Sequence, residues 1–107
     1  MTDTALPPEP APSDIAAISG SLLLEFGAAW CGYCRAAQPL IGQALAGKSH
    51  IRHLRIEDGK GRRLGRHFRV KLWPTLVLLA DGEEVGRLVR PQDVEAITAL
   101  LSMTRPD

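Results

Sequence analysis

The stretch that most constrains the fold is TLVLLADGEEVGRLV, residues 75–89, in which two strand-forming runs are joined by Asp81 and Gly82. Asp-Gly between two such runs is the strongest short signal for a β-hairpin, because its turn needs positive φ at both central residues. A hairpin alone does not bury a core, so the other elements have to extend its sheet or cover its faces.

Two further runs supply strands to this sheet. SLLLEFGA, residues 21–28, is too short for a helix before the glycine and is typical of a central strand buried on both faces. IRHLRIE, residues 51–57, alternates apolar and polar positions with a slip at His53. A helix predicted over residues 31–45 separates the two runs, so we expect these strands to be parallel.

Three shorter helices complete the predicted elements. SDIAAIS follows the proline-rich start of the chain and is expected to be capped by Ser13 or Asp14. Residues 62–68 form a short basic helix, and the last helix is predicted to begin at Pro91. Together the elements predict an α/β protein with a mixed, roughly four-stranded sheet flanked by helices.

The length of 107 residues indicates one domain, which we place at residues 13–103. Residues 1–12 alternate proline with small or acidic residues and are expected to form a flexible tail, with docking of a partner as the alternative. Residues 104–107 are expected to form a polar stub. The apolar runs are too short to cross a bilayer and no secretory signal is evident, so we expect a cytoplasmic protein, or a periplasmic one if a leader was removed.

The only two cysteines, Cys31 and Cys34, lie where the first predicted strand gives way to the long helix. There the sulfur of Cys31 meets unpaired backbone N–H groups and the positive end of the helix dipole, which stabilise a thiolate. Cys34 lies almost one turn later on the same helix face, close enough to form a disulfide with Cys31. The spacing therefore predicts an attacking and a resolving thiol for disulfide exchange.

Two other interpretations of the cysteines remain open. They are a pair of inert buried thiols, or half of a zinc site. Zinc needs further ligands, and only His50, His53 and His67 are available as histidines. These histidines lie on other elements, so we expect no metal.

The stretch FGAAWCGYC is similar to the active-site stretch of the thioredoxin family, and the resemblance extends over about residues 13–103. Pro39 lies where thioredoxins kink their active-site helix, and WPT at 73–75 resembles their cis-proline loop. The resemblance implies a thioredoxin fold, from which this chain is expected to depart in that its first strand is short or absent. It also implies a thiol–disulfide oxidoreductase that reduces or exchanges disulfides of protein substrates through a Cys31–Cys34 pair, without a cofactor, and that is recycled by a reductase or another thiol donor.

The resemblance further assigns roles to individual residues. Glu25 stands where thioredoxins often carry a buried acid that assists proton transfer to and from the second cysteine. Trp73 and Pro74 correspond to the loop whose backbone pairs with the bound substrate chain, although either tryptophan of the site could instead be a simple core or surface aromatic. The full set expected to contact substrate is Trp30, Gly32, Tyr33, Trp73, Pro74 and Thr75.

Three departures from the family pattern bear on function. Glu25 replaces the usual aspartate, Gly32-Tyr33 replaces Gly-Pro, and LVRPQ at 88–92 lacks the glycine usual in the last strand. The dipeptide between the cysteines helps to set the redox potential, so the direction of electron flow stays open, with reduction favoured over isomerisation. The missing glycine indicates a modified substrate groove.

Residues 48–71 hold nine Lys or Arg against two acids, Glu57 and Asp58. This stretch is either a solvated face or a patch that steers an acidic protein or a glutathione-like anion to Cys31. The net charge of +1 and the absence of a nucleic-acid motif argue against nucleic acid. A thioredoxin-fold binding module or chaperone without redox turnover is the alternative function, and we expect a monomer in either case.

Overall fold

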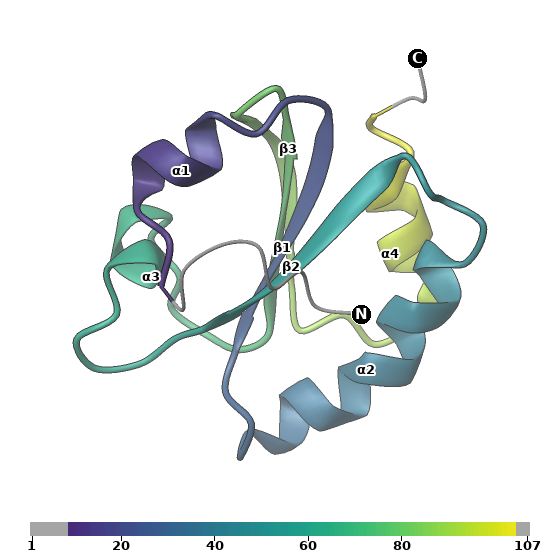
Figure 1. Ribbon diagram of the computed structural model, residues 1–107. Helices are drawn as coiled ribbons and strands as arrows, with labels where there is room; N and C mark the ends of the chain where they lie inside the picture. The colour runs from purple at the N-terminus through teal and green to yellow at the C-terminus, as the bar shows by residue number, and fades with distance from the viewer. Residues whose placement is uncertain (1–8, 105–107) are drawn as a thin grey trace.

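The hairpin and the two apolar runs form one sheet of four strands in the order β2-β1-β3-β4. The structure, a computed structural model, describes residues 9–104 (Figure 1). The elements along the chain are α1 (Pro12–Ala16), β1 (Ser21–Gly27), α2 (Gly32–Leu45), β2 (Ile51–Glu57), α3 (Arg63–His67), β3 (Thr75–Ala80), β4 (Glu83–Val89) and α4 (Val94–Leu101). The predicted α/β class with a mixed sheet is confirmed.

The strand directions follow from the connections. β1 and β2, joined through α2, are parallel, whereas β3 is antiparallel to both β1 and β4. The β3–β4 pairing shifts register between Leu78 and Leu79. In the described residues 9–104 no strand precedes β1, in agreement with the prediction of a short or absent first strand.

β1 is buried on both faces because helices cover both sides of the sheet. Figure 1 shows α1 and α3 on one side and α2 and α4 on the other. Successive side chains of a strand point to opposite faces, so Leu22 and Leu24 pack toward α1 and α3 while Leu23 packs toward α2 and α4. Glu25 follows Leu23 at an interval of two and therefore lies on the α2 side of the sheet.

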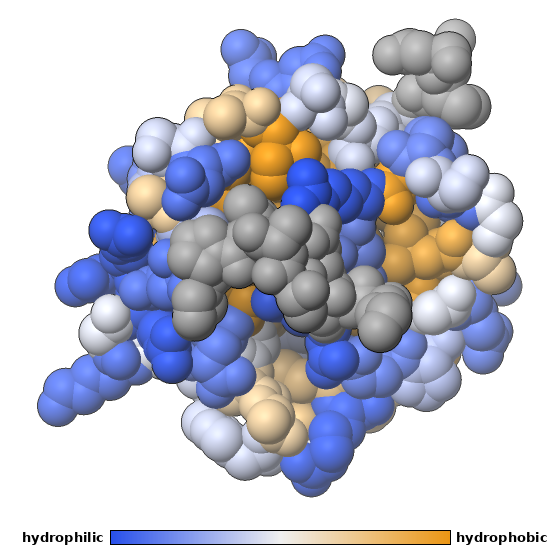
Figure 2. Space-filling view, in the orientation of Figure 1, coloured by the Kyte–Doolittle hydropathy of each residue, from blue (hydrophilic) through white to orange (hydrophobic). Residues whose placement is uncertain are grey.

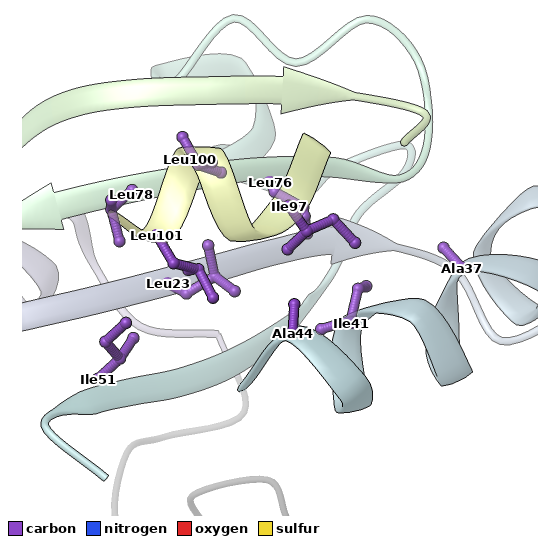
Figure 3. Packing of buried hydrophobic residues seen from close by; sticks show 10 residues of the cluster. All are labelled: Leu23, Ala37, Ile41, Ala44, Ile51, Leu76, Leu78, Ile97, Leu100 and Leu101. Carbon is purple, nitrogen blue, oxygen red and sulfur yellow. The ribbon is translucent and has the colours of Figure 1, made fainter. Parts of the chain in front are cut away.

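Each side of the sheet has its own hydrophobic cluster. Figure 3 shows the cluster on the α2 and α4 side, which consists of Leu23, Ala37, Ile41, Ala44, Ile51, Leu76, Leu78, Ile97, Leu100 and Leu101. The cluster on the other side consists of Ile15, Leu22, Leu24, Phe26, Leu54, Ile56, Leu64, Val77 and Leu79. The two clusters hold β1 in place between the helix layers.

Two predicted helix starts are corrected by the structure. α4 begins at Val94 instead of Pro91, because the carboxylate of Asp93 accepts a hydrogen bond from the Ala96 N–H at 2.8 Å and caps the helix there. α1 begins after Ala11, so neither Ser13 nor Asp14 is its cap. Instead, Asp14 lies inside the first turn and its carboxylate accepts a hydrogen bond from the Ala11 N–H at 2.8 Å.

The predicted tail and stub lie mostly outside the described residues. Of the tail, residues 9–12 are described: Pro10 is buried and Pro12 begins α1. The Glu9 carboxylate accepts a hydrogen bond from the Arg63 N–H at 2.7 Å, which joins this segment to the start of α3.

The surface around α3 is strongly polar. Figure 2 shows hydrophilic side chains over α3 and the loop before it, the part of the chain that carries four of the nine basic residues of the stretch 48–71. Across residues 9–104, none of the helices combines the length and the apolar character that a bilayer crossing requires.

The turn between β3 and β4 packs against the end of α1 and generates the first prediction. Gly82 has φ +84°, and a Cβ there would lie 2.4 Å from the carbonyl oxygen of Ala16. Gly82→Ala should therefore lower the free energy of unfolding by about 2 kcal/mol or more, measured by urea denaturation. Gly20→Ala is the matched control, because Gly20 has φ +80° but no atom within 4 Å of its added Cβ. This variant should lower the free energy of unfolding by only about 1 kcal/mol. Equal losses in the two variants would contradict the role assigned to the Ala16 contact.

Candidate active site

Cys31 is the N-cap residue of α2 and so occupies the position that serine or aspartate fills in most helices. Its backbone is extended, with φ −79° and ψ 119°, and its Sγ accepts a hydrogen bond from the Cys34 N–H at 3.2 Å. Both thiols are free, and each cysteine is 6% exposed. The capping geometry directs the backbone donors of the first helical turn at one sulfur.

The pKa values of the two thiols are shifted in opposite directions. Burial by itself would raise the pKa of Cys31, but hydrogen bonds from the Cys34 thiol and from the backbone N–H groups of Cys34 and Tyr33, together with the charge of Arg90, lower that pKa below its ordinary value. Burial raises the pKa of Cys34 to about 11, and its hydrogen bond to Cys31 and the negative charges of Cys31 and Glu25 add to the rise. Cys31 therefore ionises first.

The end of β1 leaves room for Cys34. Gly27 is the last residue of the strand, and a Cβ built on it would lie 2.7 Å from the Cys34 Sγ. Because that separation is shorter than any ordinary van der Waals contact, a side chain at position 27 and the present position of this sulfur exclude one another. Gly27 was not among the residues predicted for the site.

Glu25 lies on β1 beneath the cysteines and is 4% exposed. One of its carboxylate oxygens lies 2.8 Å from His53 Nε2 on β2, and the other accepts a hydrogen bond from the Gln38 side chain on α2. Arg55 Nε lies 3.9 Å from the second oxygen. A buried carboxylate without partners would cost several kcal/mol, so these three side chains account for the acid in the core.

Glu25 and Cys34 line the same surface pocket. The other lining residues are Gly27, Ala28, Ala29, Arg55, Ile56 and Glu57. The pocket therefore places the Glu25 carboxylate and the Cys34 thiol on the wall of one cavity. The only signal of the Glu25 partners in the sequence is the slip at His53, a polar residue where the alternation of β2 calls for an apolar one.

The cis-proline loop predicted from WPT is present, because the Trp73–Pro74 peptide bond is cis. Trp73 packs against Cys31 and Cys34, and its indole N–H donates a hydrogen bond to Asp58 Oδ2 at 2.9 Å. The Thr75 side chain is buried and its hydroxyl donates to the Leu72 carbonyl at 2.6 Å, so it supports the loop from inside. Pro74 is also buried.

Two aromatic side chains stand exposed around Cys31. Trp30 is 71% exposed and Tyr33 is 61% exposed, with the exposed Gly32 beside Tyr33. The rings of Trp30 and Trp73 meet edge to face, with centroids 5.4 Å apart. These residues and the cis-proline loop form an apolar rim around a sulfur that is itself nearly covered.

Arg90 is a member of this site that the sequence prediction missed. Its backbone N–H donates to the Pro74 carbonyl at 2.9 Å, and its side-chain Nε donates to the Trp73 carbonyl at 2.8 Å. Its guanidinium carbon lies 3.9 Å from the centroid of the Tyr33 ring. Arg90 has φ +50°, a backbone conformation that favours glycine, and lies in the LVRPQ stretch where the family glycine was missing.

The zinc interpretation finds no cluster to support it in the described part of the chain. Within residues 9–104 no three His, Cys, Asp or Glu side chains are grouped so that they could hold a metal ion. His53 is engaged with Glu25 instead.

The opposite pKa shifts generate a prediction for thiol reactivity. Iodoacetamide at pH 7 should label Cys31 at least about 100 times faster than Cys34, because only a thiolate reacts and a Cys34 thiol with a pKa of about 11 is about one part in ten thousand ionised at that pH. Labelling sites are read by peptide mass spectrometry across a pH series.

Replacing the donor thiol refines this test. Cys34→Ala removes one hydrogen bond to Cys31 and should move the pH profile of Cys31 labelling upward, whereas Cys34→Ser keeps a donor and should move it less. Equal labelling of the two wild-type cysteines at pH 7 would contradict the assignment of the ionised thiol.

Comparisons with known proteins agree with this geometry. The thioredoxin family model matches residues 11–103. A thioredoxin of Chlamydia trachomatis is 33% identical over 84 residues, which cover 78% of this chain and 82% of the relative. The structure of reduced thioredoxin 2 from Pseudomonas aeruginosa superposes with a TM-score of 0.81 at 46% identity, covering 95% of this chain and 96% of that one. A mutant thioredoxin of Halobacterium salinarum superposes with a TM-score of 0.72 at 31% identity, covering 98% and 99% of the two chains. The chain therefore belongs to the thioredoxin family.

Proposed function

We propose that Cys31 is the attacking thiol and Cys34 the resolving thiol of the disulfide exchange that this chain catalyses. As a member of the thioredoxin family the chain is a thiol–disulfide oxidoreductase. The observation that supports the assignment is the hydrogen bond from the Cys34 N–H to the Cys31 Sγ, which belongs to the set of donors that stabilise a thiolate at Cys31 alone. The comparisons give no support to a binding module without redox turnover.

The proposed reaction has two steps. The Cys31 thiolate attacks one sulfur of a substrate disulfide, forms a mixed disulfide and releases the other substrate sulfur as a thiolate, which takes up a proton. Cys34 then loses its proton and attacks the Cys31 sulfur, which releases the second substrate thiolate and closes the Cys31–Cys34 disulfide. Two electrons pass to the substrate, which leaves as two thiols.

Glu25 is proposed as the proton acceptor of the second step. A thiol with a pKa of about 11 is a poor nucleophile at neutral pH, so Cys34 needs a base when it attacks. The Glu25 carboxylate lines the same pocket as Cys34, and His53 and Gln38 hold it from two sides. The carboxylate passes the proton to water in that pocket.

The rim around Cys31 is proposed as the substrate platform. Trp30, Gly32 and Tyr33 are exposed near Cys31, and Trp73 packs against the cysteine cluster while the adjoining Pro74 is buried. Thr75 contributes by fixing the loop to the Leu72 carbonyl instead of by contact at the surface. A peptide lying on this rim would bring its disulfide to Cys31.

We assign the chain the direction usual for its family, reduction. Thioredoxins act on protein disulfides and are recycled by thioredoxin reductase. The proposed substrates are protein disulfides, and a reductase or another thiol donor would reopen the Cys31–Cys34 bond. The cytoplasm, as a reducing compartment, suits this direction.

A redox titration in glutathione buffers tests the proposed function. The Cys31–Cys34 pair should close reversibly with a midpoint near about −270 mV, as for a thioredoxin-like reductant. The oxidised fraction is measured by thiol alkylation and intact mass. A midpoint near about −180 mV would instead indicate an oxidant or isomerase, and a pair that never closes would refute the proposed chemistry.

The single-cysteine variants assign the two roles in the same buffers. Cys34→Ser should accumulate a glutathione adduct on Cys31, because nothing resolves the mixed disulfide. Cys31→Ser should accumulate little adduct at pH 7, since burial, the first cause of the raised Cys34 pKa, remains in this variant. Adducts of equal amount on both variants would reject the attacking and resolving assignment.

Glu25→Gln should separate the two steps kinetically. With an aromatic disulfide whose thiolate products are coloured, attack by Cys31 should keep its rate, while release of the second thiolate should slow by roughly tenfold or more. Rapid mixing resolves the two phases. Glu57→Gln is the matched control, because Glu57 lines the same pocket and undergoes the same chemical change. An unchanged second phase in Glu25→Gln would leave Glu25 as a structural partner of His53 and Gln38 only.

A further inference from the structure

Arg90 holds its guanidinium between two parts of the proposed substrate platform, the Trp73 carbonyl and the Tyr33 ring. Its Nε is bound to the Trp73 carbonyl and its guanidinium lies over Tyr33, so one side chain spans the cis-proline loop and the first turn of α2. Both contacts restrict the rotamers of a long side chain, and the cation–π contact with Tyr33 fixes its height above the ring. The charge is therefore held in one position instead of moving freely on the surface.

The guanidinium retains binding capacity in this position. Arginine has five N–H donors, and within the described residues 9–104 the side chain of Arg90 donates through one of them, Nε, to the Trp73 carbonyl. Among residues 9–104, no carboxylate forms an ion pair with Arg90. Its terminal Nη groups are the part of the fork that can bind a carboxylate in a bidentate manner.

Arg87, three residues earlier on β4, shows the opposite arrangement. Its Nε and Nη2 bind the two oxygens of Glu84 at 2.7 and 2.8 Å, and Nη2 also donates to the Phe68 carbonyl at 2.8 Å. The fork of Arg87 is thus satisfied by an acid of the chain itself. Within residues 9–104, Arg87 therefore has an acidic partner, whereas Arg90 has none.

Arg90 also lies near the reacting sulfur. Its charge is one of the causes that stabilise the Cys31 thiolate, and its ring partner Tyr33 is two residues from Cys31 in the first turn of α2. The guanidinium therefore lies on the same side of the first turn of α2 as the exposed Tyr33 ring, next to the residue that receives a substrate disulfide. A group on the substrate next to that disulfide falls within reach of the Nη donors.

We propose that Arg90 is a specificity-determining residue that binds a carboxylate carried next to the reacting disulfide of the substrate. The preferred substrates are disulfides in which an acidic residue, or a free terminal carboxylate, adjoins the cysteine. The inference rests on the proposed function, because it concerns the substrate of the Cys31 attack. The two steps of disulfide exchange stay as described above. The substrate carboxylate forms an additional charge-assisted hydrogen bond with Arg90 when the substrate binds.

A matched set of peptide disulfides tests this inference. The three peptides share one sequence and differ in a single group: Glu beside the cysteine with an amidated end, Gln in its place, and Gln with a free terminal carboxylate beside the cysteine. Each is mixed in excess with the reduced chain, and the second-order rate of thiol loss is measured in a single turnover. The wild-type chain should reduce the Glu peptide about five- to tenfold faster than the amidated Gln peptide. The free-acid peptide shows whether a terminal carboxylate serves as well as a side chain.

Variants identify the residue responsible. Arg90→Gln should bring the Glu-to-Gln rate ratio close to one, and Arg90→Lys should give an intermediate ratio because it keeps the charge but loses the planar fork. Arg87→Gln removes the same charge from β4 and should keep the wild-type ratio. The ratio is internal to each variant, so a general loss of rate or stability does not alter it.

The outcomes distinguish failure of the proposed function from failure of the role proposed for Arg90. If the wild-type chain reduces none of the peptides, the proposed function fails and the inference fails with it. If it reduces the Glu peptide and the amidated Gln peptide at the same rate, the proposed function stands and the role of Arg90 is rejected. A preference that survives Arg90→Gln, or that Arg87→Gln also abolishes, likewise rejects Arg90 as the selecting residue.

Discussion

The burial of β1 on both faces is the constraint on which the rest of this structure depends. The strand supplies Leu22 and Leu24 to one core cluster and Leu23 to the other, so neither helix layer packs without it. A strand held in this way fixes the position and direction in which the chain leaves the sheet. That exit leads directly into the turn where Cys31 caps α2, and the position of the reactive sulfur is therefore set by the core.

The two cysteines show that burial does not decide which thiol ionises. Both are 6% exposed, and burial raises the pKa of both. The difference comes from the direction of the hydrogen bonds: donors converge on Cys31, whereas the Cys34 thiol donates a hydrogen bond to Cys31 and lies in the negative field of the Glu25 carboxylate. One helical turn therefore lowers the pKa of one thiol and raises the pKa of the other, although the two side chains are identical.

The fold could be predicted from the sequence because its signals are local. The Asp81-Gly82 turn, the apolar run of β1 and the spacing of the cysteines each lie within a few residues, and the predicted sheet followed from them. The helix starts of α1 and α4 were predicted less well, because several neighbouring residues can cap a helix and only the geometry selects among them.

The contacts of the site were harder to predict because they join distant segments. The partners of Glu25 come from α2 and β2, and only the slip at His53 indicated one of them. The missing glycine in LVRPQ indicated a modified substrate groove but not the role of Arg90, whose side-chain contacts depend on how the end of β4 meets the cis-proline loop.

Gly27 shows that the tightest requirement at this site falls on a residue with no functional group. The space that a side chain would need there is filled by the Cys34 sulfur. In a survey of every substitution along the chain, position 27 should therefore tolerate as little change as the cysteines, although glycine exchanges neither electrons nor protons. A loss of function on substitution of Gly27 would then reflect the space that the Cys34 sulfur occupies, and not a chemical role of residue 27.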